Sequence, residues 1–158
     1  MEVYLDNAST TKVSTEVFEA MKPYFLESFG NPSSLHNKGI AVRKVINKSR
    51  KQVASLLNCN HKEIFFTSCG TESINWALKG LAFANKTKGE IITTKIEHHA
   101  TLHAARFLEE LGYIVHYLDV DKEGFIKLDQ LRSLINNNTL LVSVILANNE
   151  IGTIQNIK

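Results

Sequence analysis

What this chain has little of narrows the class of protein before any motif is considered. It has two cysteines, Cys59 and Cys69, with no CxxC pair and no disulfide-rich spacing, which is typical of a reducing compartment. No apolar run approaches membrane-spanning length, and residues 1–6 lack the basic and apolar regions of a signal peptide. We therefore expect a cytoplasmic protein with no membrane partner.

The chain also lacks a strong charge of either sign. Its 18 Lys and Arg residues against 16 Asp and Glu residues give a net charge of +2, so electrostatics favours no nucleic-acid partner. Of its 158 residues, 44% are hydrophobic, which is enough to bury a core. This length predicts one globular domain.

The rest of the chain is organised around residues 63–81. An apolar, aromatic run at 63–67 predicts a strand, and small hydroxylated residues around Gly70 then predict a tight turn. Helical spacing follows at Ile74, Ala77, Leu78 and Leu81. The N–H groups at such a helix start bind phosphate, although the same residues also serve as ordinary helix caps. Neither a P-loop nor a dinucleotide fingerprint is present.

Alternating strand and helix patterns continue on both sides of this stretch. Helices are predicted at 14–25, 37–57, 102–111 and 128–135, strands at 90–94, 113–118 and 140–146, a loop at 29–36 and a turn at 121–124. The inward faces of the first two helices are predicted to comprise Val17, Phe18, Met21 and Phe25, and Val42, Val45, Ile46, Val53, Leu56 and Leu57. Continuously apolar strands that alternate with helices indicate an α/β fold with a mostly parallel sheet covered by helices.

Polar residues follow three of the predicted strands, at 68–73, 97–99 and 148–150. In parallel sheets ligands collect beyond the carboxyl ends of the strands, so phosphate donors, the His98 imidazole and the Asn149 amide are candidates for one pocket. His98 also suits a structural role, and Asn149 suits a cap or turn. His99 and His103 have i, i+4 spacing, but no third ligand is evident, so no metal site is predicted.

Five segments, taken together, resemble one family. They are YLDNASTT at 4–11, FGNPSSLH at 29–36, FTSCGTES at 66–73, EHHA at 97–100 and NNEIG at 148–152. Their order and spacing resemble the cysteine desulfurases, which are pyridoxal-phosphate enzymes of the class V aminotransferase group. The sequence SCGTES at 68–73 is closer to the nitrogen-fixation (NifS-type) branch of the family. The resemblance covers essentially the whole chain.

This resemblance implies an incomplete large domain of the PLP-transferase fold type I. Residues 1–13 would form an N-terminal arm that lines the active site as part of the family's small domain, and residues 14–158 the first, truncated part of the cofactor-binding large domain. Gly70 and Thr71 would hold the cofactor phosphate. His98, the candidate catalytic residue, would stack on the ring and help move protons, and Asn149 would hydrogen-bond the ring's phenolic oxygen.

The resemblance also implies a reaction and its partners. L-cysteine would be converted to L-alanine by a homodimer that passes sulfur to an acceptor such as an iron–sulfur scaffold protein. The family's ring-nitrogen aspartate, its Ser-x-His-Lys lysine and its persulfide cysteine have no counterpart in this sequence, and Ser9 stands where alanine is common. We expect the 158 residues alone to be inactive. A selenocysteine lyase, an aminotransferase or a non-catalytic anion- or partner-binding module are the alternatives.

Overall fold

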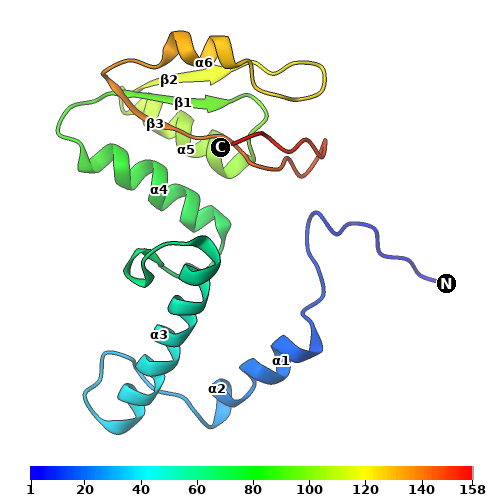
Figure 1. Cartoon of the computed structure of the whole chain (residues 1–158), viewed down its shortest axis with the longest axis vertical. Coiled ribbons are helices and arrows are strands. Elements are labelled where there is room, and N and C mark those ends of the chain that lie inside the picture. Colours follow the sequence, from blue (N-terminus) through cyan, green and yellow to red (C-terminus); the bar gives the residue numbers. More distant parts are fainter. Residues whose placement is uncertain (158) are drawn as a thin grey trace. The chain divides into compact units, whose positions relative to one another are not determined.

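The computed structural model describes residues 1–157, which divide after Phe66 into two units, Met1–Phe66 and Thr67–Lys158 (Figure 1). The first unit is helical, and the second holds the sheet. The division into an arm at 1–13 and a large domain from residue 14 concerns the family's complete domains and stays a prediction.

In the first unit, helices α1 (Thr15–Met21) and α2 (Pro23–Leu26) replace the single helix predicted at 14–25. Ser14 caps α1 by accepting a hydrogen bond from the Val17 amide at 3.3 Å. The helix breaks at Lys22 because Pro23 has no N–H and instead occupies the first position of α2, where none is needed. The prediction of one continuous helix was therefore wrong.

Helix α3 (Asn37–Leu57) and the 3₁₀ helix η1 (His61–Glu63) complete this unit. Its buried residues are Gly39, Ala54 and Ile64. The predicted inward faces are only partly correct: Val17, Phe18, Met21 and Phe25 are exposed, as are Leu56 and Leu57, whereas Val42, Val45, Ile46 and Val53 are half-buried. Residues of α1, α2 and α3 line open grooves in this unit. The apolar side chains of α1 and α2 remain exposed because no further element of the unit covers them.

The second unit contains a parallel sheet of three strands, as predicted. Strand β1 (Glu90–Thr94) lies between β2 (Ile114–Leu118) and β3 (Thr139–Val142). Ile91 is in register with Val115 on one side and with Leu141 on the other. Because β1 has a partner on each side, four of its five residues are fully buried.

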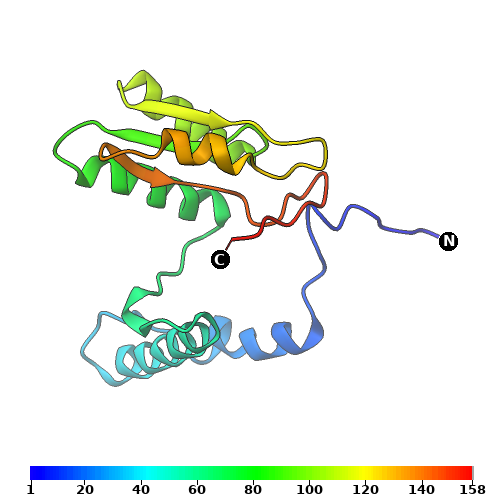
Figure 2. The same cartoon turned by 45° about the horizontal axis from the view of Figure 1, so that its top comes forward.

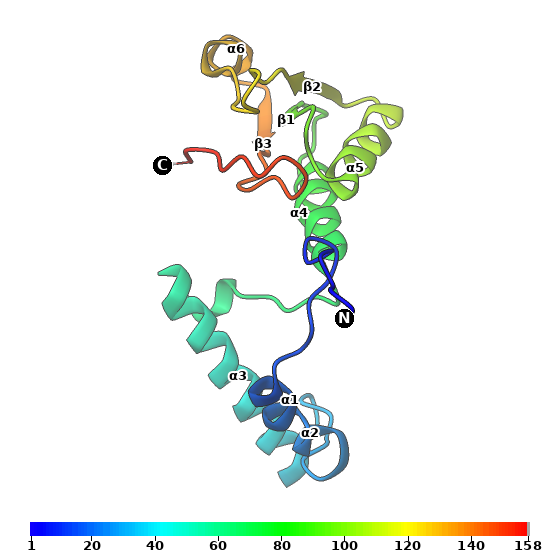
Figure 3. The ribbon, with the colours of Figure 1, turned by 90° about the vertical axis from the view of Figure 1, so that its right-hand side faces the viewer.

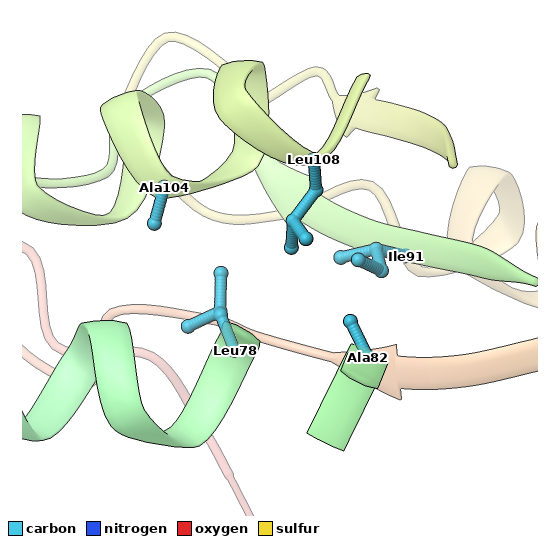
Figure 4. Close-up of a cluster of buried hydrophobic side chains, with 5 residues drawn as sticks. All are labelled: Leu78, Ala82, Ile91, Ala104 and Leu108. Carbon is cyan, nitrogen blue, oxygen red and sulfur yellow. The ribbon is translucent and has the colours of Figure 1, made fainter. Parts of the chain in front are cut away.

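Helices cover both faces of this sheet. Helices α4 (Gly70–Ala84) and α5 (His99–Glu110) pack on one face, and α6 (Leu128–Leu134) lies on the opposite side (Figure 3). Side chains of α4, α5 and β1 converge to form the core, which contains Leu78, Ala82, Ile91, Ala104 and Leu108 (Figure 4). Among the helices of residues 1–157, none has both the length and the apolar character that a bilayer span requires.

Two strand predictions need correction. Residues 64–67 are extended but belong to none of the three strands, since an apolar pattern becomes a strand only where a neighbouring strand supplies hydrogen bonds. Strand β3 ends at Val142 rather than at residue 146. It leaves the ladder early because the Ile145 amide donates to the side chain of Glu97, at 2.6 Å, instead of to another strand.

Candidate functional site

The candidate residues gather at the carboxyl edge of the sheet. Helix α5 begins shortly after β1 ends, and the 143–152 segment follows β3 at the same edge because the strands are parallel. Helix α4 leads back to the start of β1, so its N-terminal end also lies toward the edge where β1 ends (Figures 1 and 2). Ligands of parallel sheets bind at this edge.

A cavity of about 270 Å³ opens here, close to the lower size limit of small-molecule sites. It is lined by residues 95–99 and Leu102 on one side and by residues 148–151 on the other. His98 and Asn149, which are 51 positions apart in the sequence, therefore face one space. Gly70 and Thr71 are not among the lining residues, although α4 begins at the same end of the unit.

His98 has a structural role and also lines the cavity. It is the N-cap of α5, and its Nδ1 atom accepts a hydrogen bond from the Ala100 amide at 3.1 Å. A neutral imidazole that accepts at Nδ1 carries its proton at Nε2. The cap therefore fixes both the ring orientation and the tautomer, and leaves an N–H donor for a ligand.

The sequence made Asn149 a candidate for a turn, but in the structure the side chain of Asn148 stabilises that turn. Asn148 is buried, and its Oδ1 atom accepts hydrogen bonds from the amides of Glu150 at 2.8 Å and Ile151 at 3.0 Å. Its Nδ2 atom donates to the Ile96 carbonyl at 2.7 Å. Among residues 1–157 the side-chain amide of Asn149 has no hydrogen-bond partner, so it is available to a ligand.

A second set of hydrogen bonds joins the segment that follows Asn149 to the turn at residues 121–126. The buried Gln155 side chain accepts from the Ile126 amide at 3.2 Å and donates to the Gly124 carbonyl at 2.7 Å. The Thr153 hydroxyl donates to the Glu123 carbonyl at 2.5 Å. The 148–155 segment is thus fixed to the 121–126 turn, which makes the cavity wall rigid.

Glu97 is the residue that sequence reasoning undervalued. Only 8% of it is exposed, and its Oε1 atom accepts hydrogen bonds from the Ile145 amide at 2.6 Å and the Thr94 hydroxyl at 3.2 Å. Burial raises the pKa of this carboxyl, against the lowering effect of those hydrogen bonds. A carboxylate three positions after a buried strand was the available signal, because such a group needs partners if it is buried.

The predicted anion turn starts α4. By helix geometry the first amides, including those of Gly70 and Thr71, have no partner within the helix. A Cβ added to Gly70 would meet nothing within 4 Å, so the space beside this residue is open. Glu72 accepts from the Ser68 amide at 2.7 Å, and hydrogen bonds from the Glu72 amide and the Ser68 hydroxyl lower the pKa of Cys69.

The histidine pair on α5 forms no metal centre. The ring centroids of His99 and His103 are 5.8 Å apart, but residues 1–157 contain no group of three or more metal-binding side chains.

Comparison with known proteins decides the family. The family model described as aminotransferase class-V matches residues 3–158. The chain belongs to the class V aminotransferase family. It is 54% identical over 158 residues to the cysteine desulfurase IscS of Clostridium botulinum (strain Kyoto / Type A2), covering 99% of this chain and 40% of that protein. It is 55% identical over 157 residues to the cysteine desulfurase IscS of Methanosarcina thermophila, covering 99% of this chain and 39% of that protein.

Solved structures give the same fold for this class V chain. A NifS-like protein superposes with a TM-score of 0.95 at 47% identity, covering 99% of this chain and 43% of that one. SspA in complex with cysteine superposes with a TM-score of 0.90 at 39% identity, covering 94% and 43%. The fold predicted from the sequence, part of a NifS-like α/β domain with a parallel sheet, is confirmed. The chain spans about 40% of the length of the curated relatives it matches.

Proposed function

We propose that this chain is the N-terminal portion of a cytoplasmic, pyridoxal-phosphate-dependent cysteine desulfurase. The observation that carries the proposal is the cavity at the carboxyl edge, into which β1 and β3 bring His98 and Asn149. The identity to cysteine desulfurases over the whole chain supports the substrate class, L-cysteine. A solved relative described as a complex with cysteine supports it too.

The residues present fit this cofactor. A flat ring with a phosphate and a phenolic oxygen needs an anion cradle, a stacking partner and a donor. The first amides of α4, at Gly70 and Thr71, suit the phosphate because a helix start carries partial positive charge. The capped His98 ring suits stacking, and the unpaired Asn149 amide suits the phenolic oxygen.

Gly70, Thr71 and Asn149 would orient the cofactor, whereas His98 would both orient it and handle a proton. When bound, pyridoxal phosphate supplies the electron sink for chemistry at the substrate Cα. The neutral His98 ring would carry its proton at Nε2 and could hold or transfer it there, since Nδ1 accepts the hydrogen bond from the Ala100 amide. Asn149 would donate a hydrogen bond to the phenolic oxygen of the cofactor.

The remaining parts of the proposal concern the whole protein. We propose a homodimer that converts L-cysteine to L-alanine and passes the sulfur to an acceptor such as an iron–sulfur scaffold protein. The 158 residues contain no lysine in a Ser-x-His-Lys context. We therefore expect no turnover of cysteine by this polypeptide alone, only non-covalent binding of the cofactor.

Binding of pyridoxamine 5′-phosphate tests the proposal. This form has no aldehyde, so it cannot react with surface lysines. We expect His98→Ala and Asn149→Ala each to weaken its binding about tenfold, whereas His103→Ala and Asn137→Ala, exposed residues outside the cavity, leave it unchanged. Titration calorimetry measures the affinities. Equal binding by all four variants would contradict the proposed site.

The phosphate cradle is tested with a backbone substitution. Proline is tolerated at the first position of a helix, and Cys69 already has the extended conformation that proline requires of its predecessor. Gly70→Pro therefore removes one amide donor with little change to α4, and Gly70→Ala keeps that donor. We expect only Gly70→Pro to reduce the preference for pyridoxamine 5′-phosphate over unphosphorylated pyridoxamine. A Thr71→Ala variant, compared with Thr87→Ala at an exposed site, extends the test to the hydroxyl.

A further inference from the structure

The two walls of the cavity are joined by side chains that belong to neither His98 nor Asn149. Glu97, next to His98, accepts the hydrogen bond from the Ile145 amide at 2.6 Å. Asn148, next to Asn149, donates to the Ile96 carbonyl at 2.7 Å. Each cross-link therefore starts beside one ligand-facing residue. The Asn148 cross-link ends on the opposite wall, and the Glu97 cross-link ends at Ile145, three positions before that wall begins.

The Glu97 cross-link is the more heavily built of the two. Its Oε1 atom also accepts from the Thr94 hydroxyl at 3.2 Å, and the Thr101 side chain donates to the same carboxylate. These partners come from the end of β1, the first turn of α5 and the segment after β3. A single carboxylate thus fixes the three elements that form the cavity.

Glu97 is buried, so its carboxylate loses most of its contact with water. The residue is only 8% exposed, and burying a carboxylate costs free energy that its hydrogen bonds must offset. The charged and titratable side chains around the same cavity are Lys95, His98, His99 and Glu150. Within residues 1–157 none of them forms an ion pair with Glu97, so its hydrogen bonds from Ile145, Thr94 and Thr101 define its role.

We infer that Glu97 is a positioning residue for the ring-binding half of the site: its carboxylate sets the separation between the His98 ring and the Asn149 amide. The inference rests on the proposed function, and it assigns Glu97 to binding of the ring but not to binding of the phosphate. Loss of the carboxylate releases the Ile145 amide and lets the two walls separate, which weakens recognition of a flat ring between them. The anion cradle at the start of α4 makes no contact with Glu97 and keeps its affinity for phosphate.

The test compares Glu97→Leu with Glu97→Gln, and Glu110→Leu at the exposed end of α5 is the control. Glutamine keeps an oxygen at the position of Oε1, so Ile145 and Thr94 retain their acceptor. We expect Glu97→Leu to weaken binding of pyridoxamine 5′-phosphate about tenfold, because a buried amide donor loses its partner. The inhibition constant of inorganic phosphate against that ligand should stay the same. Glu97→Gln should restore most of the affinity, and Glu110→Leu should bind as the unaltered chain does.

Two measurements on Glu97→Asp test the inference if Glu97→Leu folds poorly. Glu97→Asp keeps the charge but shortens the side chain by one methylene, so it should show the same selective loss of ring binding. Amide hydrogen exchange at Ile145 and in residues 148–152 of the ligand-free chain should speed up in Glu97→Asp and remain slow in Glu97→Gln. In a His98→Ala, Asn149→Ala background, Glu97→Leu should have no further effect on affinity.

The outcomes separate the two proposals. If the unaltered chain binds no pyridoxamine 5′-phosphate, the proposed cofactor function fails and this role fails with it. If it binds, and Glu97→Leu and Glu97→Asp bind equally well, only the inference is overturned. A parallel loss of phosphate affinity would also overturn it, since that result indicates a general structural role.

Discussion

The two units of this chain differ in what their secondary structure encloses. In Met1–Phe66 the buried residues are Gly39, Ala54 and Ile64, whereas the unit from Thr67 encloses a core of large side chains that includes Leu78, Ile91 and Leu108. Every buried polar or charged residue among the described ones belongs to the second unit. Caps and turns build helices in both units, but the second unit also buries Glu97, Asn148 and Gln155 together with their hydrogen-bond partners. Among the described residues the buried Thr93 hydroxyl is an exception, with no partner.

The largest expected contrast is in core packing. Leu108→Ala removes a fully buried side chain and should lower the free energy of unfolding by about 2–5 kcal/mol. The matched control is Leu56→Ala in the first unit, where the side chain is 86% exposed and a change within about 0.5 kcal/mol is expected. Urea denaturation followed by circular dichroism measures both. Similar losses for the two variants would remove the contrast.

Gly39 and Gly70, each in the first turn of a helix, allow the stability of the two units to be compared at matched positions. A Cβ at Gly39, in the first turn of α3, would lie 2.6 Å from the carbonyl oxygens of Asn31 and Ser34, so Gly39→Ala should destabilise the first unit by about 1–3 kcal/mol. Gly70→Ala, in the first turn of α4, meets open space and should be neutral or stabilise by up to about 1 kcal/mol. Thermal denaturation should therefore move in opposite directions, and a loss of stability in both variants would contradict this prediction.

Two carboxylates give the second unit opposing responses to pH. Hydrogen bonds from His116 and then Asn136 hold the pKa of Glu90 below its usual value of 4.5, so its stabilisation is complete above pH 4.5 and is lost as pH falls through the lowered pKa. Burial raises the pKa of Glu97, so its destabilising effect is absent below pH 4.5 and grows as pH rises through the raised pKa.

Denaturation at a series of pH values measures this difference. Relative to Glu90→Gln, the unaltered chain should gain stability as pH rises toward 4.5. Relative to Glu97→Gln, it should lose stability as pH rises above 4.5. Slopes of the same sign for the two comparisons would show that one of the two pKa directions is wrong.

The smallest expected effect compares the two exposed cysteines, one in each unit. Hydrogen bonds from the Glu72 amide and then the Ser68 hydroxyl lower the pKa of Cys69, which raises its thiolate fraction near neutral pH. Limited treatment with iodoacetamide should therefore label Cys69 before Cys59, as read by peptide mass spectrometry. Inorganic phosphate should slow labelling of Cys69 alone if it binds at the α4 amides. Preferential labelling of Cys59 would contradict the lowered pKa of Cys69.

Much of the fold was predictable because its signals are local. The capping Ser14, the 37–57 helix and the Gly124 turn follow from propensities that a short segment carries by itself. Predictions failed where a partner decides the outcome. Residues 64–67 have a strand pattern without a place in the sheet, and Phe18 and Leu56 have apolar character without an enclosing layer.

The sequence alone determined the family, the order of helices and strands from residue 70 onward, and the choice of His98 and Asn149 as candidates, because these depend on residue types and on their spacing. The tertiary structure alone decided that Asn148 rather than Asn149 makes the turn, and that Glu97 joins the two walls of the cavity. Both outcomes depend on hydrogen bonds between residues almost 50 positions apart or on competition between neighbours for the same amides. Such contacts are fixed only when β1 and β3 lie side by side.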